Sequence, residues 1–204
     1  MQETNKYTVF NIREYLNDQN VELGEDDLRQ VLSEFSCEKN PDVEKFIKEQ
    51  SIEFAKKQQS VTYLVFSTDD VQLLGYFAIT IKPITVNEEP FSNTVKRKLA
   101  RVSELNEQNH TYNLAAYLIA QLGKNYHSGA NERITGKELL GLALKQIQQL
   151  QYLAGGMVVF VETLNEEKLL SFYRDKGFQQ FDSRLSASSS SEPHELIQLL
   201  KILK

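Results

Sequence analysis

The chain has 204 residues, of which 41% are hydrophobic and 25% are charged, and its formal net charge is −5 at pH 7. This composition is that of an ordinary folded protein and excludes a disordered one. No apolar run approaches the roughly 20 residues that a membrane helix needs, so we expect no membrane association. The polar start, Met1 to Lys6, lacks the apolar stretch of a signal peptide.

The single cysteine, Cys37, cannot form an internal disulfide, which favours a reducing, cytoplasmic location. The three histidines are scattered, so no spacing is typical of metal ligands and we expect no metal. The negative net charge argues against a broad electrostatic surface for nucleic acid. One local basic cluster stands out, formed by Lys96, Arg97, Lys98 and Arg101.

The first half of the chain predicts helices followed by a hairpin. Helical apolar spacing is present over Glu25–Glu34 and again from Pro41 to about Gln58. Strands are expected at Val61–Phe66 and Leu73–Ile81, joined by a polar turn as an antiparallel hairpin. Residues 83–111 then form an insertion, in which a basic, partly amphipathic helix is expected at 93–105.

The second half alternates strands and helices. The expected order is strand, helix, strand, helix and two strands, over 114–122, 136–153, 157–161, 165–176, 178–181 and 196–203. The run Ser186–Ser191, before the last strand, is typical of a flexible loop. One central βαβ crossover is flanked by antiparallel strands, so we expect a mixed α/β (α+β) fold with helices on both faces of the sheet. We treat 1–204 as one domain.

A possible phosphate site lies where the long helix begins, in the loop Arg133-Ile134-Thr135-Gly136-Lys137-Glu138. A helix N-terminus offers unpaired N–H groups and the positive end of a dipole, and glycine lets the backbone approach an anion closely. By itself this signal is weak, because glycine at a helix start is more often a turn or packing residue. The loop lacks the residues of a Walker A loop or a dinucleotide fingerprint.

A second motif, Ser171-Phe172-Tyr173-Arg174-Asp175-Lys176-Gly177-Phe178, follows the next expected strand by about a dozen residues. Together with the glycine loop it resembles the GNAT superfamily of acetyl-CoA-dependent N-acetyltransferases. Four N-terminal segments are similar to the GNAT branch that includes acetyltransferase toxins of bacterial toxin–antitoxin systems; they are 35–37, 40–47, 62–66 and 75–79.

The resemblance implies a GNAT-like, mostly antiparallel sheet and acetyl-CoA as co-substrate. It implies that the backbone of Leu122, Gly123 and Lys124 contacts the pantetheine and that Tyr173 lies near the thioester. The implied pyrophosphate contacts are Arg133, Thr135, Gly136, Lys137 and Glu138. Glu138 departs from the family pattern, which prefers glycine or alanine there, and a carboxylate near phosphates is unfavourable unless it points away.

The implied chemistry is attack of a neutral amine on the thioester carbonyl, with Tyr173 donating a proton to the leaving thiolate. On its position alone, Tyr173 is more often a tyrosine packed in a helix near Phe172 and Phe178; the whole motif favours the functional role. The oxyanion would be met by a backbone N–H near Leu122 or Gly123. No general base is evident; Glu162 and His127 are candidates, each of which could also be an ordinary surface or strand-end residue.

Three hypotheses about function remain open from the sequence. The first is an acetyltransferase that acts on the amine of a small molecule or protein. The second is toxin-like acetylation of aminoacyl-tRNA, against which the acidic pI of 5.4 counts and for which only the basic cluster near Arg97 speaks. The third is a non-catalytic binding protein on a GNAT scaffold. The family also allows a homodimer.

Overall fold

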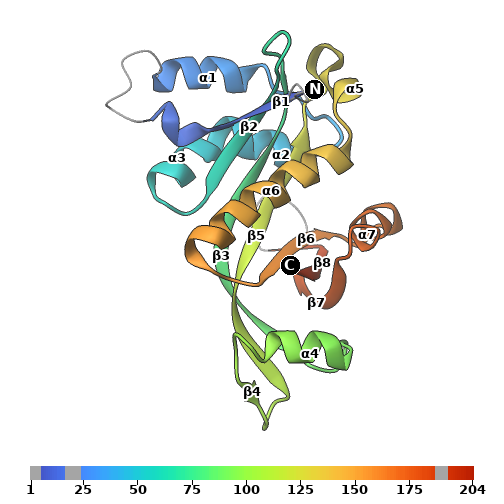
Figure 1. The fold of residues 1–204 in the computed structure, drawn as a ribbon. Coiled ribbons are helices and arrows are strands. Elements are labelled where there is room, and N and C mark those ends of the chain that lie inside the picture. The colour runs from blue at the N-terminus through green and yellow to red at the C-terminus, as the bar shows by residue number, and fades with distance from the viewer. Residues whose placement is uncertain (1–5, 17–23, 187–192) are drawn as a thin grey trace, which may run out of the picture. The chain divides into compact units, whose positions relative to one another are not determined.

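The computed structural model describes residues 6–16, 24–186 and 193–204 (Figure 1). Met1 to Asn5 and most of the serine-rich run, Ala187 to Ser191, lie outside these ranges. The chain comprises two units. Unit 1 contains residues 1–80 and 120–146, and unit 2 contains residues 81–119 and 147–204. Within the described residues, no helix is both long and apolar enough to span a bilayer.

The sheet of unit 1 begins with an edge strand that the apolar pattern of the sequence does not predict. This strand, β1 (Tyr7–Asn11), pairs antiparallel with β2 (Val61–Ser67), from Tyr7↔Ser67 to Asn11↔Tyr63. The expected hairpin is confirmed, because β2 pairs antiparallel with β3 (Leu73–Asn87). The adjacent strand is β5 (Thr111–Lys124), whose last residues belong to unit 1.

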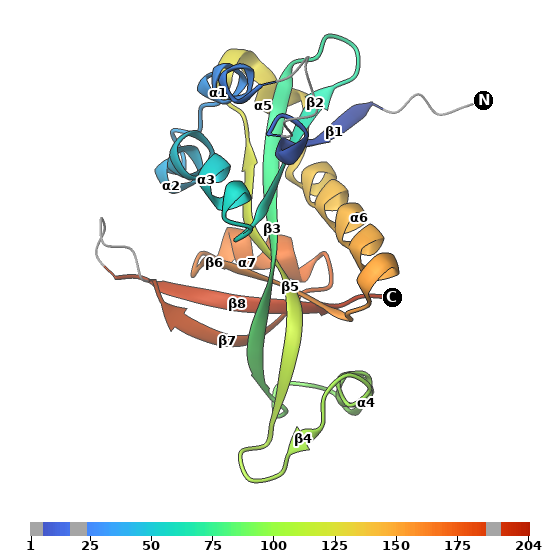
Figure 2. The same ribbon diagram turned by 90° about the vertical axis from the view of Figure 1, so that its left-hand side faces the viewer.

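Helices cover both faces of this sheet, as expected (Figure 2). On one side lie α1 (Glu25–Ser33), α2 (Pro41–Lys45) and α3 (Ser51–Lys56), and on the other lies α6 (Gly136–Ala154). Apolar side chains of the first group pack against β2 and β3, which buries Leu28, Leu32, Val43, Phe46, Ile47 and Ile52 with Leu64, Phe66, Tyr76 and Ala78.

The single helix expected from Pro41 to Gln58 is interrupted. Residues Phe46–Gln50 form a π-helical turn between α2 and α3, and the N–H of Ser51 bonds to the carbonyl of Phe46, five residues earlier. The hydroxyl of Ser51 also donates to the carbonyl of Ile47 at 2.6 Å. Apolar spacing predicts a helix here but does not reveal such a one-residue insertion in its hydrogen-bond ladder.

Unit 2 contains the expected parallel pairing. Strand β6 (Val158–Leu164) runs parallel to β5, with Tyr117 opposite Val159 and Ile119 opposite Val161. Because α6 lies between these strands in the sequence, the predicted βαβ crossover is confirmed. β8 (Glu195–Ile202) pairs antiparallel with β6, and β7 (Gln179–Leu185) pairs antiparallel with β8. Helix α7 (Glu167–Arg174) follows β6.

The region expected as an insertion, 83–111, is largely an extension of two strands. β3 continues to Asn87 and β5 begins at Thr111, and a short helix α4 (Asn93–Leu99) and strand β4 (Leu105–Asn106) lie between them. The helix predicted over 93–105 was therefore too long. Leu105 does not continue its apolar face, because this residue pairs with Tyr112 in β5 instead.

Candidate active site

The glycine loop of unit 1 forms a capping box at the start of α6. The backbone N–H of Thr135 donates to the Glu138 carboxylate at 2.8 Å, and the N–H of Glu138 donates to the Thr135 hydroxyl oxygen at 3.1 Å. The same hydroxyl donates back to Glu138 Oε2 at 2.7 Å. This reciprocal arrangement satisfies two of the N–H groups that a helix N-terminus leaves unpaired.

Two further N–H groups at this helix end remain available. Among the described residues, none accepts a hydrogen bond from the backbone of Gly136 or Lys137, and none pairs with the Lys137 ammonium group. The Lys137 side chain is exposed. Two free N–H groups, the positive end of a helix dipole and one free cation are the components of an anion site.

The edge strand β1 contacts the same helix end. The Tyr7 hydroxyl donates to Glu138 Oε1 at 2.8 Å and lies 3.2 Å from the carbonyl oxygen of Arg133. Lys6 Nζ lies 3.4 Å from the same carboxylate oxygen. Tyr7 is thus a candidate site residue that no local sequence pattern reveals, because its partner lies 131 positions away.

Three hydrogen bonds hold the Glu138 carboxylate in one orientation. The Thr135 hydroxyl, the Thr135 N–H and the Tyr7 hydroxyl together lower the pKa of Glu138 to about 2. The carboxylate is therefore ionised at neutral pH, and its oxygens are turned toward Thr135 and Tyr7. The signal for this arrangement is visible in the sequence, since Thr135 and Glu138 have the spacing of a capping box.

The guanidinium group of Arg133 is engaged within unit 1. It donates to Asp70 at 2.6 Å, to Gln72 at 2.6 Å and to the Ser67 hydroxyl at 2.8 Å, at the end of β2 and in the turn that follows it. Arg133 is the last residue of the short helix α5 (Ala130–Arg133). Arg133 therefore holds the loop to that turn, and any phosphate would compete with these three acceptors.

Three residues at the end of β5 complete the set predicted in unit 1. Lys124 Nζ donates to the carbonyls of Asn131 at 2.6 Å and Ile134 at 3.1 Å, which holds the approach to the loop. Gly123 is buried and Leu122 is half-buried. The structure thus brings Lys124, Arg133, Thr135 and Glu138 into one network around the start of α6, with Gly136 and Lys137 at its open end.

Tyr173, in unit 2, lies in the last turn of α7. The N–H of Gly177 donates to the carbonyl of Arg174 at 2.9 Å, and the N–H of Phe178 donates to that of Tyr173 at 3.1 Å. Gly177 has a positive φ of 80°. This is a Schellman motif, in which a left-handed glycine ends the helix and the next residue packs back on it. The rings of Phe178 and Tyr173 accordingly meet edge-on at 5.6 Å.

The Tyr173 side chain combines a buried ring with a free hydroxyl. The residue is 9% exposed, and burial raises the pKa of its phenol to about 12. Among the described residues, none forms a hydrogen bond with this hydroxyl, and the oxygen is not among the fully enclosed unpaired atoms. A phenol with this pKa stays protonated at neutral pH, so it can donate a proton or hydrogen bond but cannot serve as a base.

The two candidate bases differ in their surroundings. Glu162 accepts two hydrogen bonds from Arg184, at 2.6 and 2.5 Å, and one from Gln198 at 2.7 Å. Burial alone would raise the pKa of Glu162, but these bonds outweigh it and the pKa is lowered. Such a carboxylate is a weak base. His127, in unit 1, follows β5 within a short turn and is exposed.

Stability should fall in acid because Glu138 in this loop and Asp70, which Arg133 contacts, have lowered pKa values. Glu138 and Asp70 both ionise with a pKa of about 2, against ordinary values of 4.5 and 3.8. A carboxylate whose pKa is lowered by folding stabilises the folded state at pH values above its ordinary pKa, and this stabilisation is lost as the pH falls toward 2.

Urea unfolding at pH 7, 4 and 3 should show this loss of stability. A variant with Asp70→Asn and Glu138→Gln should lose less between pH 4 and 3; an identical loss would contradict these assignments.

The chain was compared with known proteins. No protein-family model matches it, and no curated protein matches its sequence. Solved structures do match. AtaT complexed with acetyl-methionyl-tRNAfMet is 15% identical over 94% of this chain and 93% of AtaT, with a TM-score of 0.60. This chain has the fold of AtaT and KacT. The KacT structure, a tyrosine-to-phenylalanine mutant, is 18% identical over 97% of this chain and 95% of KacT, with a TM-score of 0.62.

A third match, to a chain of the structure of AtaTR bound with AcCoA, is 16% identical over 97% of this chain and 93% of the matched chain, with a TM-score of 0.53. The predicted GNAT-like fold is confirmed, and so is the likeness to the toxin branch at the level of the fold. Identities this low carry no information about which residues act. The roles of the site residues therefore stay predictions.

Proposed function

We propose that this chain transfers an acetyl group from acetyl-CoA to the amino group of an aminoacyl-tRNA. The observation that carries the proposal is the start of α6, where the N–H groups of Gly136 and Lys137 and the Lys137 ammonium have no partner among the described residues and can bind an anion. The fold adds to this, because it is shared over almost the whole chain with AtaT, whose solved complex contains acetyl-methionyl-tRNAfMet.

In this proposal the pyrophosphate of acetyl-CoA binds at the start of α6. Oriented N–H groups at a helix end hold phosphate oxygens without an energetic cost for reorganisation. The exposed ammonium of Lys137 adds an attraction to the phosphates, which salt weakens. The backbone of Leu122, Gly123 and Lys124 would contact the pantetheine. Thr135 and Glu138 would act indirectly, by fixing the first turn of the helix, and Arg133 would act by fixing the loop.

The proposed reaction is direct transfer. The neutral amine nitrogen attacks the thioester carbonyl carbon, a C–N bond forms, and the C–S bond breaks. The phenol of Tyr173 gives its proton to the departing thiolate and regains one from solvent, and the amine nitrogen loses its proton to water. A pKa of about 12 keeps this phenol protonated at neutral pH, as the role requires.

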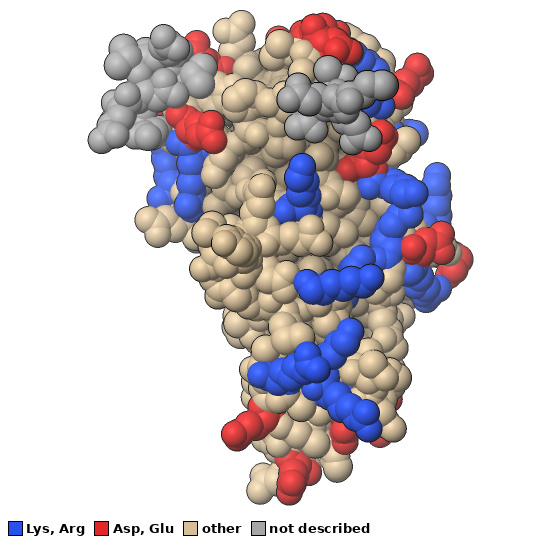
Figure 3. Space-filling view, in the orientation of Figure 1, with Lys and Arg blue, Asp and Glu red and all other residues tan. Residues whose placement is uncertain are grey.

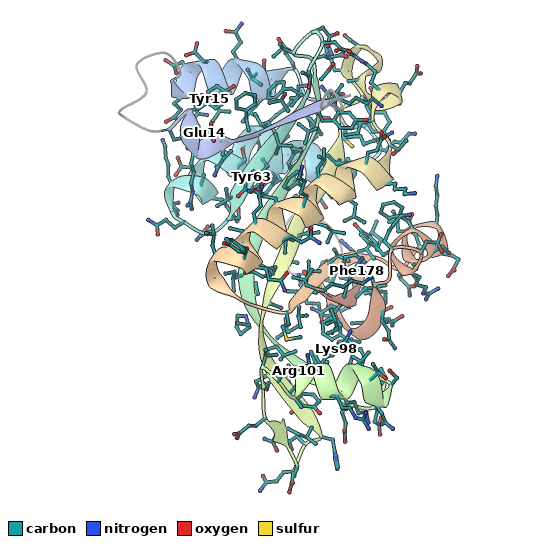
Figure 4. All side chains as sticks on the ribbon, in the orientation of Figure 1. Glu14, Tyr15, Tyr63, Lys98, Arg101 and Phe178 are labelled. Atoms are coloured by element: carbon teal, nitrogen blue, oxygen red, sulfur yellow. The ribbon has the colours of Figure 1, made fainter. Side chains whose placement is uncertain are left out.

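The acidic pI of 5.4 counts against a tRNA acceptor, but the excess of acidic residues is not shared equally by the two units. Unit 1 contains 12 Lys and Arg against 17 Asp and Glu, whereas unit 2 contains 11 of each. The negative net charge therefore belongs to unit 1. In unit 2, Lys and Arg side chains gather over α4 and around α7 (Figure 3), and Lys98 and Arg101 lie at α4 (Figure 4).

A transfer assay tests this proposal. Purified protein is incubated with acetyl-CoA labelled in the acetyl group and with charged tRNA, free amino acids, a polyamine or a lysine peptide. The proposal predicts label on the aminoacyl group of charged tRNA. Replacing Lys98 and Arg101 with glutamate should raise KM for charged tRNA but not for acetyl-CoA. Label on a small amine or peptide alone would assign a different acceptor, and no transfer to any of them would favour a binding protein.

A further inference from the structure

Glu138 occupies a position at which a carboxylate would be expected to repel a bound pyrophosphate. The contacts on the carboxylate indicate a different effect. Oε2 accepts hydrogen bonds from the backbone and the hydroxyl of Thr135, and Oε1 accepts one from Tyr7, with Lys6 at 3.4 Å. Donors therefore surround both oxygens, and they come from the loop and from β1.

These bonds fix the part of the helix that carries the free N–H groups. Gly136 is the first residue of α6, and glycine has more backbone freedom than any other residue. Without the Glu138 carboxylate, the Thr135 N–H would lose its acceptor and the hydrogen bonds to the Thr135 and Tyr7 hydroxyls would be lost. The first turn of the helix would then fray. The N–H groups of Gly136 and Lys137 would then no longer point in a fixed direction.

Two opposing effects of Glu138 can be compared. Repulsion between its carboxylate and a phosphate is offset by Lys6, whose ammonium lies 3.4 Å from Oε1, and is reduced by the donors of Thr135 and Tyr7 on the two oxygens. The same hydrogen bonds orient the first turn of the helix. The orienting effect should therefore exceed the repulsion at physiological salt.

We infer that Glu138 is a positioning residue for acetyl-CoA, held in place by Tyr7, so that removing its carboxylate weakens binding of the cofactor. This inference rests on the proposed function. It assigns a role to β1 as well, because Tyr7 connects this edge strand to the turn of α6 that would hold the pyrophosphate. It also explains why a glutamate occurs where the family pattern has glycine or alanine.

The test is calorimetric titration of acetyl-CoA into four variants at low and physiological salt. Glu138→Ala should bind about tenfold more weakly, and Tyr7→Phe about threefold more weakly. Glu138→Gln keeps an acceptor oxygen for Thr135 and removes the charge, so its Kd should stay within about threefold of the wild type. Glu132→Ala, which removes an exposed carboxylate from the preceding helix, serves as the matched control and should leave Kd unchanged.

Steady-state kinetics separate positioning from a general loss of structure. Glu138→Ala should raise KM for acetyl-CoA and retain kcat, at a temperature at which its circular dichroism matches that of the wild type. Equal or tighter binding of acetyl-CoA by folded Glu138→Ala would overturn the inference while leaving the proposed function intact. If the wild type itself does not bind acetyl-CoA, the proposed function fails, and this inference fails with it.

Discussion

Replacing Tyr173 with phenylalanine is expected to lower kcat by about 10²- to 10⁴-fold, the usual contribution of a general acid. The Kd for acetyl-CoA and the free energy of unfolding should change little. The ring is buried between Phe172 and Phe178, and phenylalanine preserves both contacts. The hydroxyl has no partner among the described residues, so its removal breaks no hydrogen bond within them. The measurement is single-turnover acetyl transfer with saturating acetyl-CoA.

Tyr117 provides the matched control for this substitution. Its hydroxyl donates to the carbonyl of Gly155 at 2.5 Å within unit 2, so it is a tyrosine with a structural hydrogen bond. Tyr117→Phe should cost about 1 kcal/mol of stability and leave kcat unchanged. If Tyr173→Phe keeps more than half of the wild-type kcat, Tyr173 is a packing residue and the proposed proton donor is wrong.

Replacing Gly123 with alanine is expected to destabilise the protein by about 1–3 kcal/mol, the usual cost of overpacking a core. A Cβ at this position would overlap Val43 Cγ1 and lie 3.2 Å from Tyr76 Cε1. Val43 lies in α2 and Tyr76 in β3, and both are buried. Neither side chain has a flexible end that could move aside, so the helix itself must shift. Urea unfolding measures the loss.

Gly141 is the matched control, since a Cβ there meets no atom within 4 Å. It lies within α6 and is exposed, so Gly141→Ala should stabilise the protein by about 0.5–1 kcal/mol. Adding Val43→Ala to Gly123→Ala should recover part of the loss, because it removes the closest atom. A Gly123→Ala variant as stable as the wild type would show that Gly123 does not lie against Val43 of α2.

The sequence predicts the order of the elements well and their limits less well. Apolar periodicity predicts α1, α6, α7 and every strand except β1 and β4, whose first residue, Leu105, falls at the end of a predicted helix. It missed β1, because Tyr7–Asn11 is a five-residue edge strand whose side chains are all half-buried, so no alternation of buried and exposed residues marks it. The π-helical turn at Phe46–Gln50 and the continuation of β3 to Asn87 are likewise set by tertiary packing rather than by local pattern.

The two motifs that pointed to the site also have structural explanations. Thr135 and Glu138 form a capping box, and Gly177 with Phe178 forms a Schellman motif that ends α7. Both local geometries could be predicted from spacing. The ties of Arg133 to Asp70 and of Tyr7 to Glu138 could not, because each joins residues more than 60 positions apart and depends on how the sheet assembles.

The claim on which the account depends is that the start of α6 holds the pyrophosphate of acetyl-CoA. Comparing the Kd of acetyl-CoA with that of acetyl-pantetheine, which carries the thioester but no phosphate, tests it most directly. The account predicts that acetyl-pantetheine binds at least about 100-fold more weakly, and that Lys137→Ala narrows this difference. Equal binding of the two compounds, or no binding of acetyl-CoA at all, would contradict it.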